Sequence, residues 1–166
     1  MTETEFRVKH SELIEYYQLI EMRLKGLCSV LFENEITEWY NRLNQYDTDP
    51  FGAMLKELED TQVKKQKAVL SEEDFKELNE VRLRRNYWVH QCFSNNEHVT
   101  FRKGEVKKSE YAEAIINDLD TAIEWDKKLT DVFSANSKGI DLQLVYDDLS
   151  KCFGFEIASI EYYPKR

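Results

Sequence analysis

The stretch "NEVRLRRNYWVHQCF", residues 79–93, sets arginines and a histidine among large apolar side chains. In an α-helix each residue turns the side-chain direction by about 100°. On that geometry one arc forms a predicted buried face made by Phe75, Leu78, Val81, Trp88, Val89, Cys92 and Phe93. Arg85 falls near the middle of this arc and Arg82 at its edge, with Asn86 and His90 just beyond. The pattern predicts one long helix over residues 71–93, with polar groups set into its apolar face.

Arg85 on the buried face requires a partner, because an unpaired guanidinium costs several kcal/mol to bury. Asn86 and His90 are four residues apart and can touch, so they belong to one polar ridge. Arg85 and His90 point about 140° apart on one helix, so their side chains cannot easily meet on a single atom. Two copies of the helix packed across a two-fold axis would bring them together.

The rest of the chain predicts an all-α fold of four to five main helices. Five Gly and two Pro among 166 residues leave few turn formers. Apolar residues at three- and four-residue spacing, together with turn signals, predict further helices over residues 11–32, 34–46, 53–61 and 110–133. Ser71 and Asp74 have the spacing of a capping box, and Ser109 is predicted to cap the last long helix. The sequence favours one domain over residues 1–135.

Two less regular segments complete the chain. Residues 97–108 are predicted to form a polar loop with a short extended piece. Residues 136–166 are predicted to be a C-terminal extension packed on the same domain. Within it we expect a short helix over 140–153, followed at 155–163 by a strand or an extended tail.

Charge and cysteine usage narrow the class of protein. The formal charge is -9, which disfavours a nucleic-acid partner. Residues 82–108, however, carry seven Arg or Lys against two Glu, a basic strip on an acidic body. Such a strip serves as a phosphate footprint or simply as a solvated helix end and loop. Three cysteines without metal-like spacing and no apolar N-terminal or membrane-length run predict a cytoplasmic protein without membrane association.

The hexapeptide "RNYWVH", from Arg85 to His90, resembles the R-x4-6-H motif of the HEPN superfamily. Asn86 stands where that family commonly carries Asn, Asp or His. The resemblance covers residues 5–135 by architecture and six residues by motif. It implies a helical bundle that dimerises through the helix over residues 71–93. In HEPN toxins paired with nucleotidyltransferase antitoxins the motif often extends to a tyrosine that is modified, and here that position is Cys92.

Many HEPN domains are metal-independent ribonucleases of toxin–antitoxin and antiviral defence systems, so the resemblance implies RNA cleavage by hydrolase-type chemistry without cofactor or metal. His90 would be the general acid and base, because imidazole exchanges protons near neutral pH. Arg85 would stabilise the phosphate in the transition state, and Asn86 would orient it or contact substrate. The products would be 2′,3′-cyclic phosphate and 5′-hydroxyl ends. Further RNA contacts are assigned to Arg82, Arg84, Arg102 and Lys103.

Two other readings stay open at the level of sequence. One keeps the dimer and discards catalysis, leaving a module that binds nucleic acid, a nucleotide or a partner protein such as an antitoxin or defence component. The other is a helical interaction protein in which Arg85 pairs with an acid on a neighbouring helix. His10 and His98 have no carboxylate or thiolate at ligand spacing in the sequence, so a metal site is not expected.

Overall fold

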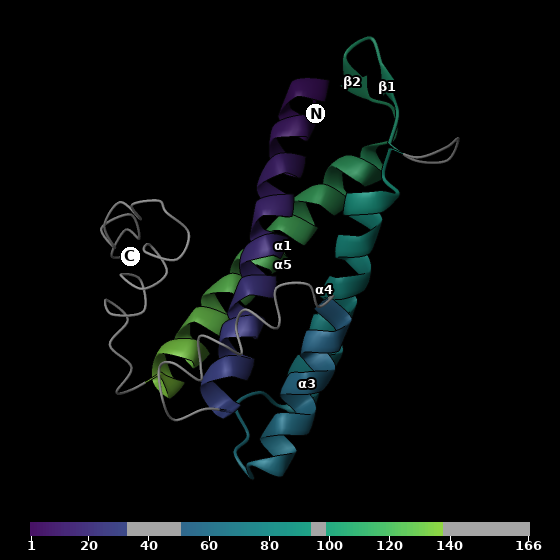
Figure 1. Cartoon of the computed structure of the whole chain (residues 1–166). Coiled ribbons are helices and arrows are strands. Elements are labelled where there is room, and N and C mark those ends of the chain that lie inside the picture. The colour runs from purple at the N-terminus through teal and green to yellow at the C-terminus, as the bar shows by residue number, and fades with distance from the viewer. Residues whose placement is uncertain (33–50, 94–98, 138–166) are drawn as a thin grey trace, which may run out of the picture.

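The computed structural model describes residues 1–32, 51–93 and 99–137, and this part of the chain is mostly helical (Figure 1). Its elements, in chain order, are α1 (Glu3–Phe32), α3 (Phe51–Lys64), α4 (Glu72–His90), β1 (Phe101–Arg102), β2 (Glu105–Val106) and α5 (Ser109–Asn136). The all-α prediction is therefore confirmed for the described residues, with one small antiparallel hairpin added. The predicted helices at 34–46 and 140–153, and the strand or tail at 155–163, lie outside them.

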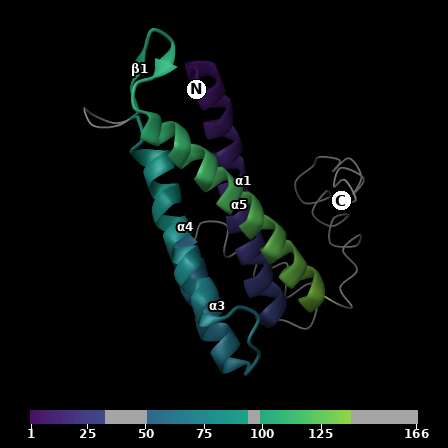
Figure 2. The same ribbon diagram turned by 180° about the vertical axis from the view of Figure 1, so that it is seen from behind.

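The two longest helices, α1 and α5, run side by side in the same direction (Figures 1 and 2). Thr2 at the start of α1 bridges to Glu105 just before α5. Near the far ends, a Cβ placed on Gly26 would lie 3.0 Å from Cε2 of Phe133, so a glycine allows this close approach. The helices α3 and α4 form an antiparallel pair beside them, and α4 runs opposite to α1 and α5.

The hydrophobic core lies between these helices. Its largest fully buried apolar side chains are Phe6, Leu13, Ile20, Leu24, Leu27, Met54, Leu58, Leu78, Trp88, Ile115 and Leu129. All four described helices contribute to this set, so they pack as one unit. In the described part of the chain, no helix combines the length and the apolar character that a membrane crossing needs.

Three predicted helix starts need correction. The helix predicted from residue 53 is α3, which begins at Phe51. The first helix begins at Glu3 rather than at Ser11, because Thr2 and Glu5 form a capping box. Oγ1 of Thr2 accepts from the Glu5 amide at 3.2 Å, and Oε2 of Glu5 accepts from the Thr2 amide at 2.8 Å. The last helix begins at Ser109 itself, with Lys108 at the cap position and no side-chain cap. The polar loop before it contains the hairpin β1–β2, which supplies the expected extended piece.

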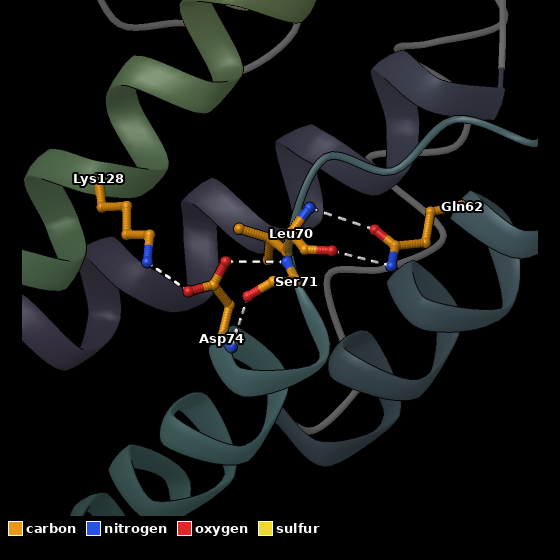
Figure 3. A network of polar contacts seen from close by, with 5 residues as sticks. All are labelled: Gln62, Leu70, Ser71, Asp74 and Lys128. Atoms are coloured by element: carbon orange, nitrogen blue, oxygen red, sulfur yellow. Dashed lines mark hydrogen bonds and ion pairs between the residues drawn. The ribbon is translucent and has the colours of Figure 1, made fainter.

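The start of α4 is held by the polar network in Figure 3. Ser71 caps the helix as predicted, and Oδ2 of Asp74 accepts from the Ser71 amide at 2.8 Å. Lys128 of α5 donates to the other oxygen of Asp74. Before the cap, the Gln62 amide group bonds the backbone of Val69 and Leu70, with a 3.0 Å bond from Nε2 to the Leu70 carbonyl. These contacts fix where α4 starts relative to α3 and α5.

This network makes stability depend on the charge of Asp74. Burial raises the pKa of its carboxyl, but hydrogen bonds from Lys128 and Ser71 outweigh burial and lower it overall. A carboxyl whose pKa is lowered by folding stabilises the fold above its unfolded pKa of about 4, and this stabilisation is lost as the pH falls below that value. We expect Asp74→Ala to reduce the free energy of unfolding by about 1–2 kcal/mol near neutral pH.

Urea unfolding measured across acidic and neutral pH checks this expectation. The difference between wild type and Asp74→Ala should shrink below a pH of about 4. Glu77→Ala, at an exposed position in the same helix, is the matched control and should differ little from wild type. A difference for Asp74→Ala that stays constant with pH would contradict the assigned role.

Candidate functional site on helix α4

The helix α4 carries all three motif residues and ends on the last of them, His90, so the prediction that the helix extends to Phe93 is wrong. Asn86 and Arg85 are half-buried, and His90 is exposed. The helix is continuous through this segment because its apolar residues anchor it in the core, with Trp88 1% and Leu78 0% exposed. The motif therefore sits on a rigid element, as a site with fixed geometry needs.

Arg85 has the partner that its place on the buried face requires. Its Nη2 donates to Oε2 of Glu21 on α1 at 3.5 Å, and its Nη1 donates to Oδ1 of Asn86 at 3.3 Å. The Arg85 side chain remains 26% exposed. Glu21 is shared, since its Oε1 lies 3.8 Å from Nζ of Lys25. A guanidinium has five N–H donors, so two contacts of this length leave donors for a phosphate.

The other two arginines of the stretch have separate environments. Arg82 donates from Nε to Oδ1 of Asn79 at 3.0 Å, and its stem lies against Gly52 at the start of α3. Arg84 donates to Asp118 of α5, which is buried, and the acid raises the pKa of the guanidinium. The structure thus gives Arg84 a structural partner and does not bring it to Arg85. The RNA contacts assigned to both residues stay predictions.

The apolar face of α4 is narrower than the sequence pattern predicts. Leu78, Val81, Trp88 and Cys92 are buried as expected. Val89 and Phe93 are 38% and 48% exposed in a single chain, so neither is buried in its core, and their placement in a dimer interface stays a prediction. The reason for Val89 is that α4 packs against α1, α3 and α5 on its other side. Phe93 lies beyond the end of α4 and contacts His10 of α1 with only part of its ring. An apolar margin therefore borders Asn86 and His90.

The side chain of His10 contacts the end of α4, a contact that the sequence did not indicate. Its Nε2 lies 2.9 Å from the carbonyl oxygen of Trp88 and 3.4 Å from Sγ of Cys92. The partners are 82 residues apart along the chain, so spacing in the sequence held no signal for the pair. Burial raises the pKa of the Cys92 thiol to about 11, which keeps it protonated near neutral pH. His10 and Cys92 therefore join α1 to the end of α4 and do not form a reactive thiolate pair.

The two remaining predicted RNA contacts lie in the hairpin. Arg102 belongs to β1 and Lys103 to the turn, and both are exposed. Figure 1 shows the hairpin beside the N-terminus, at the same end of the bundle as the end of α4. His90 is therefore the motif residue at the hairpin end, while Arg82 lies two turns further from it. Among the described residues, no group of three or more His, Cys, Asp or Glu side chains could hold a metal ion.

Comparisons with known proteins do not assign the chain to a family. No protein-family model matches the chain, and searches of curated proteins and of solved structures found no significant match.

Proposed function

We propose that the chain is a metal-independent endoribonuclease of HEPN type, acting in a toxin or antiviral defence setting. The observation that carries the proposal is the arrangement on α4, where Arg85 contacts Asn86 and exposed His90 follows one turn after Asn86. Arg85 would bind the non-bridging oxygens of the phosphate, and Asn86 would hold that guanidinium in place. His90 would take the proton from the ribose 2′-hydroxyl and return one to the 5′-oxygen.

The proposed site is completed by a second copy of the chain. Leu83 and Val89 are 47% and 38% exposed on the outer side of α4, where Asn86 and His90 also lie. Pairing two such faces across a two-fold axis would bury this apolar surface and bring Arg85 of one copy toward His90 of the other. The catalytic groups would then come from both copies.

The decisive experiment is incubation of the purified protein with RNA in EDTA, followed by analysis of the new ends. We expect cleavage to continue in the chelator and to produce 2′,3′-cyclic phosphate and 5′-hydroxyl ends. Cleavage that stops in EDTA and returns with Mg²⁺ would refute a metal-independent mechanism.

Mixing inactive variants tests the shared site. Arg85→Ala and His90→Ala proteins should each be inactive alone, yet a mixed dimer keeps one site with both wild-type groups. After full subunit exchange about a quarter of wild-type activity should return, because half the dimers are mixed and each has one intact site. Recovery of no activity in exchanged dimers would place the site within one copy.

The ion pair between Arg85 and Glu21 favours a second function, a helical interaction protein in which this arginine pairs with an acid on a neighbouring helix. A non-catalytic dimeric module that binds nucleic acid, a nucleotide or a partner protein is the other alternative. A guanidinium held by a carboxylate can serve packing alone, as it would in a purely structural helical interaction protein. Retention of RNA without any turnover would support the binding module. Absence of both binding and turnover would support the interaction protein.

A further inference from the structure

Aromatic rings and cations from three elements meet at the hairpin end of the bundle. Phe93 follows α4 directly, is 48% exposed and lies 5.1 Å from the ring of His10. The guanidinium of Arg7 on α1 lies 5.6 Å from the ring centre of Phe93 and 5.2 Å from that of Phe101 on β1. Beneath them, Phe6 packs edge-on against both rings. Phe93, Phe101 and Arg7 therefore form a supported surface, called here the aromatic platform.

The hairpin beside the platform is basic. Arg102, Lys103 and Lys107 are exposed, against one acid, Glu105, in the same segment. Lys108 is also exposed but pairs with Glu110 at 3.5 Å. On the platform side, Glu3 pairs with Arg7 at 2.8 Å, so that cation is partly neutralised. The excess positive charge thus comes from the hairpin, although the whole chain carries -9. Cations that flank an exposed ring are the combination that single-stranded nucleic acids use.

The hairpin turn keeps a lysine where the backbone disfavours one. Lys103 has a φ of 54° and Gly104 a φ of 79°, so both turn positions are left-handed. Turns of this kind favour Asn, Asp or Gly at the first position. A lysine there costs stability of about 1 kcal/mol. The exposed charge of Lys103 is therefore kept in spite of backbone strain, which is common for residues at functional sites.

We propose that the aromatic platform and hairpin bind single-stranded RNA, with an unpaired base stacked on Phe93 and hairpin cations on the backbone phosphates. A base can stack on a protein ring only when it is unpaired, which excludes duplex RNA. Phe93 lies three residues after His90, in the turn that follows the end of α4, so the stacked base would lie near the phosphate at the candidate site. The choice of RNA as the ligand rests on the proposed function. The new element is that the bound RNA is single-stranded.

The test measures binding in the full chain carrying His90→Ala, so that cleavage does not interfere. The probes are a labelled oligouridylate, which has no secondary structure, and its duplex with oligoadenylate. Fluorescence anisotropy should show clearly tighter binding to the single strand. Adding Phe93→Ala should weaken that binding roughly tenfold, whereas Phe93→Trp should preserve it. Val63→Ala, at an exposed apolar position on α3, is the matched control.

Lys103→Gly gives a second, independent readout. It should raise the melting temperature, because glycine adopts the left-handed turn without strain. It should also weaken binding of the oligouridylate and lower the salt dependence of log affinity by about one unit. A merely structural lysine would not produce these opposite changes.

Two results would overturn the proposal: duplex binding as tight as single-strand binding, or affinity unchanged in a folded Phe93→Ala protein. Neither depends on whether wild-type protein cleaves RNA. If Phe93→Ala does not change cleavage, the platform proposal is rejected and the nuclease proposal is kept. If the platform binds RNA and the protein does not cleave it, the nuclease proposal is rejected in favour of the non-catalytic module.

Discussion

Replacing His90 with alanine is expected to slow RNA cleavage roughly 100- to 10,000-fold, because it removes the group that moves the proton. Arg85→Ala should slow it roughly 100- to 1,000-fold through loss of a charged donor to the developing negative charge. Arg85→Lys should rescue only part of this loss, since an ammonium keeps the charge but lacks the planar paired donors. Single-turnover cleavage of a labelled RNA in EDTA measures all three.

Glu21→Gln separates catalysis by Arg85 from a purely structural role. It removes the charge that faces Nη2 of Arg85 but leaves the guanidinium on α4. If Arg85 acts on the phosphate, this variant should cleave RNA within a fewfold of wild type. If Arg85 serves only the ion pair, Arg85→Ala and Glu21→Gln should lower stability alike and neither should change cleavage. Wild-type rates in both Arg85→Ala and His90→Ala would end the nuclease proposal.

The largest expected effect on stability comes from Asp118, which is 5% exposed inside the bundle. Its Oδ2 accepts from Nε1 of Trp88 at 2.6 Å, and its other oxygen accepts from Arg84. Asp118→Ala would leave the buried indole N–H without its acceptor and remove the partner of Arg84. We expect the free energy of unfolding to fall by about 3 kcal/mol.

Thermal unfolding checks this value, since about 3 kcal/mol corresponds to a fall of roughly 6–12 °C in Tm for a chain of this size. Asp120→Ala, two residues later on α5 and exposed, is the matched control and should change Tm little. Arg84→Ala should cost less than Asp118→Ala, because the Arg84 side chain is 53% exposed and the indole bond survives. An equal fall in Tm for Asp118→Ala and Asp120→Ala would contradict a stabilising role for the buried contacts of Asp118.

Most of the described fold was predictable from local patterns. Apolar spacing placed the helices, and Ser71 with Asp74 located the start of α4, because capping depends on residues three apart. The same capping signal occurs at Thr2 and Glu5, before the apolar pattern that begins near Ser11, and it sets the start of α1. Ser109 was misjudged because a serine before a helical pattern can also begin the helix instead of capping it.

The candidate site was predictable only up to the helix that carries it. The sequence placed Arg85, Asn86 and His90 on one helix and required a partner for the arginine. The partner is Glu21, which lies 64 residues from Arg85 in the sequence, and the contact depends on how α1 packs against α4. The contacts of His10 with Cys92 and of Arg84 with Asp118 likewise join distant elements.

By itself, the sequence determined which segments are helical, because backbone hydrogen bonding, capping and apolar spacing act over a few residues. Tertiary structure alone decided which polar side chains meet and how much of Val89 and Phe93 stays exposed. It also decided that rings from α1, from β1 and from the turn after α4 gather beside the hairpin. The physical reason is that such contacts depend on the relative placement of whole helices. Packing fixes that placement through the combined core, and no short stretch of sequence encodes it.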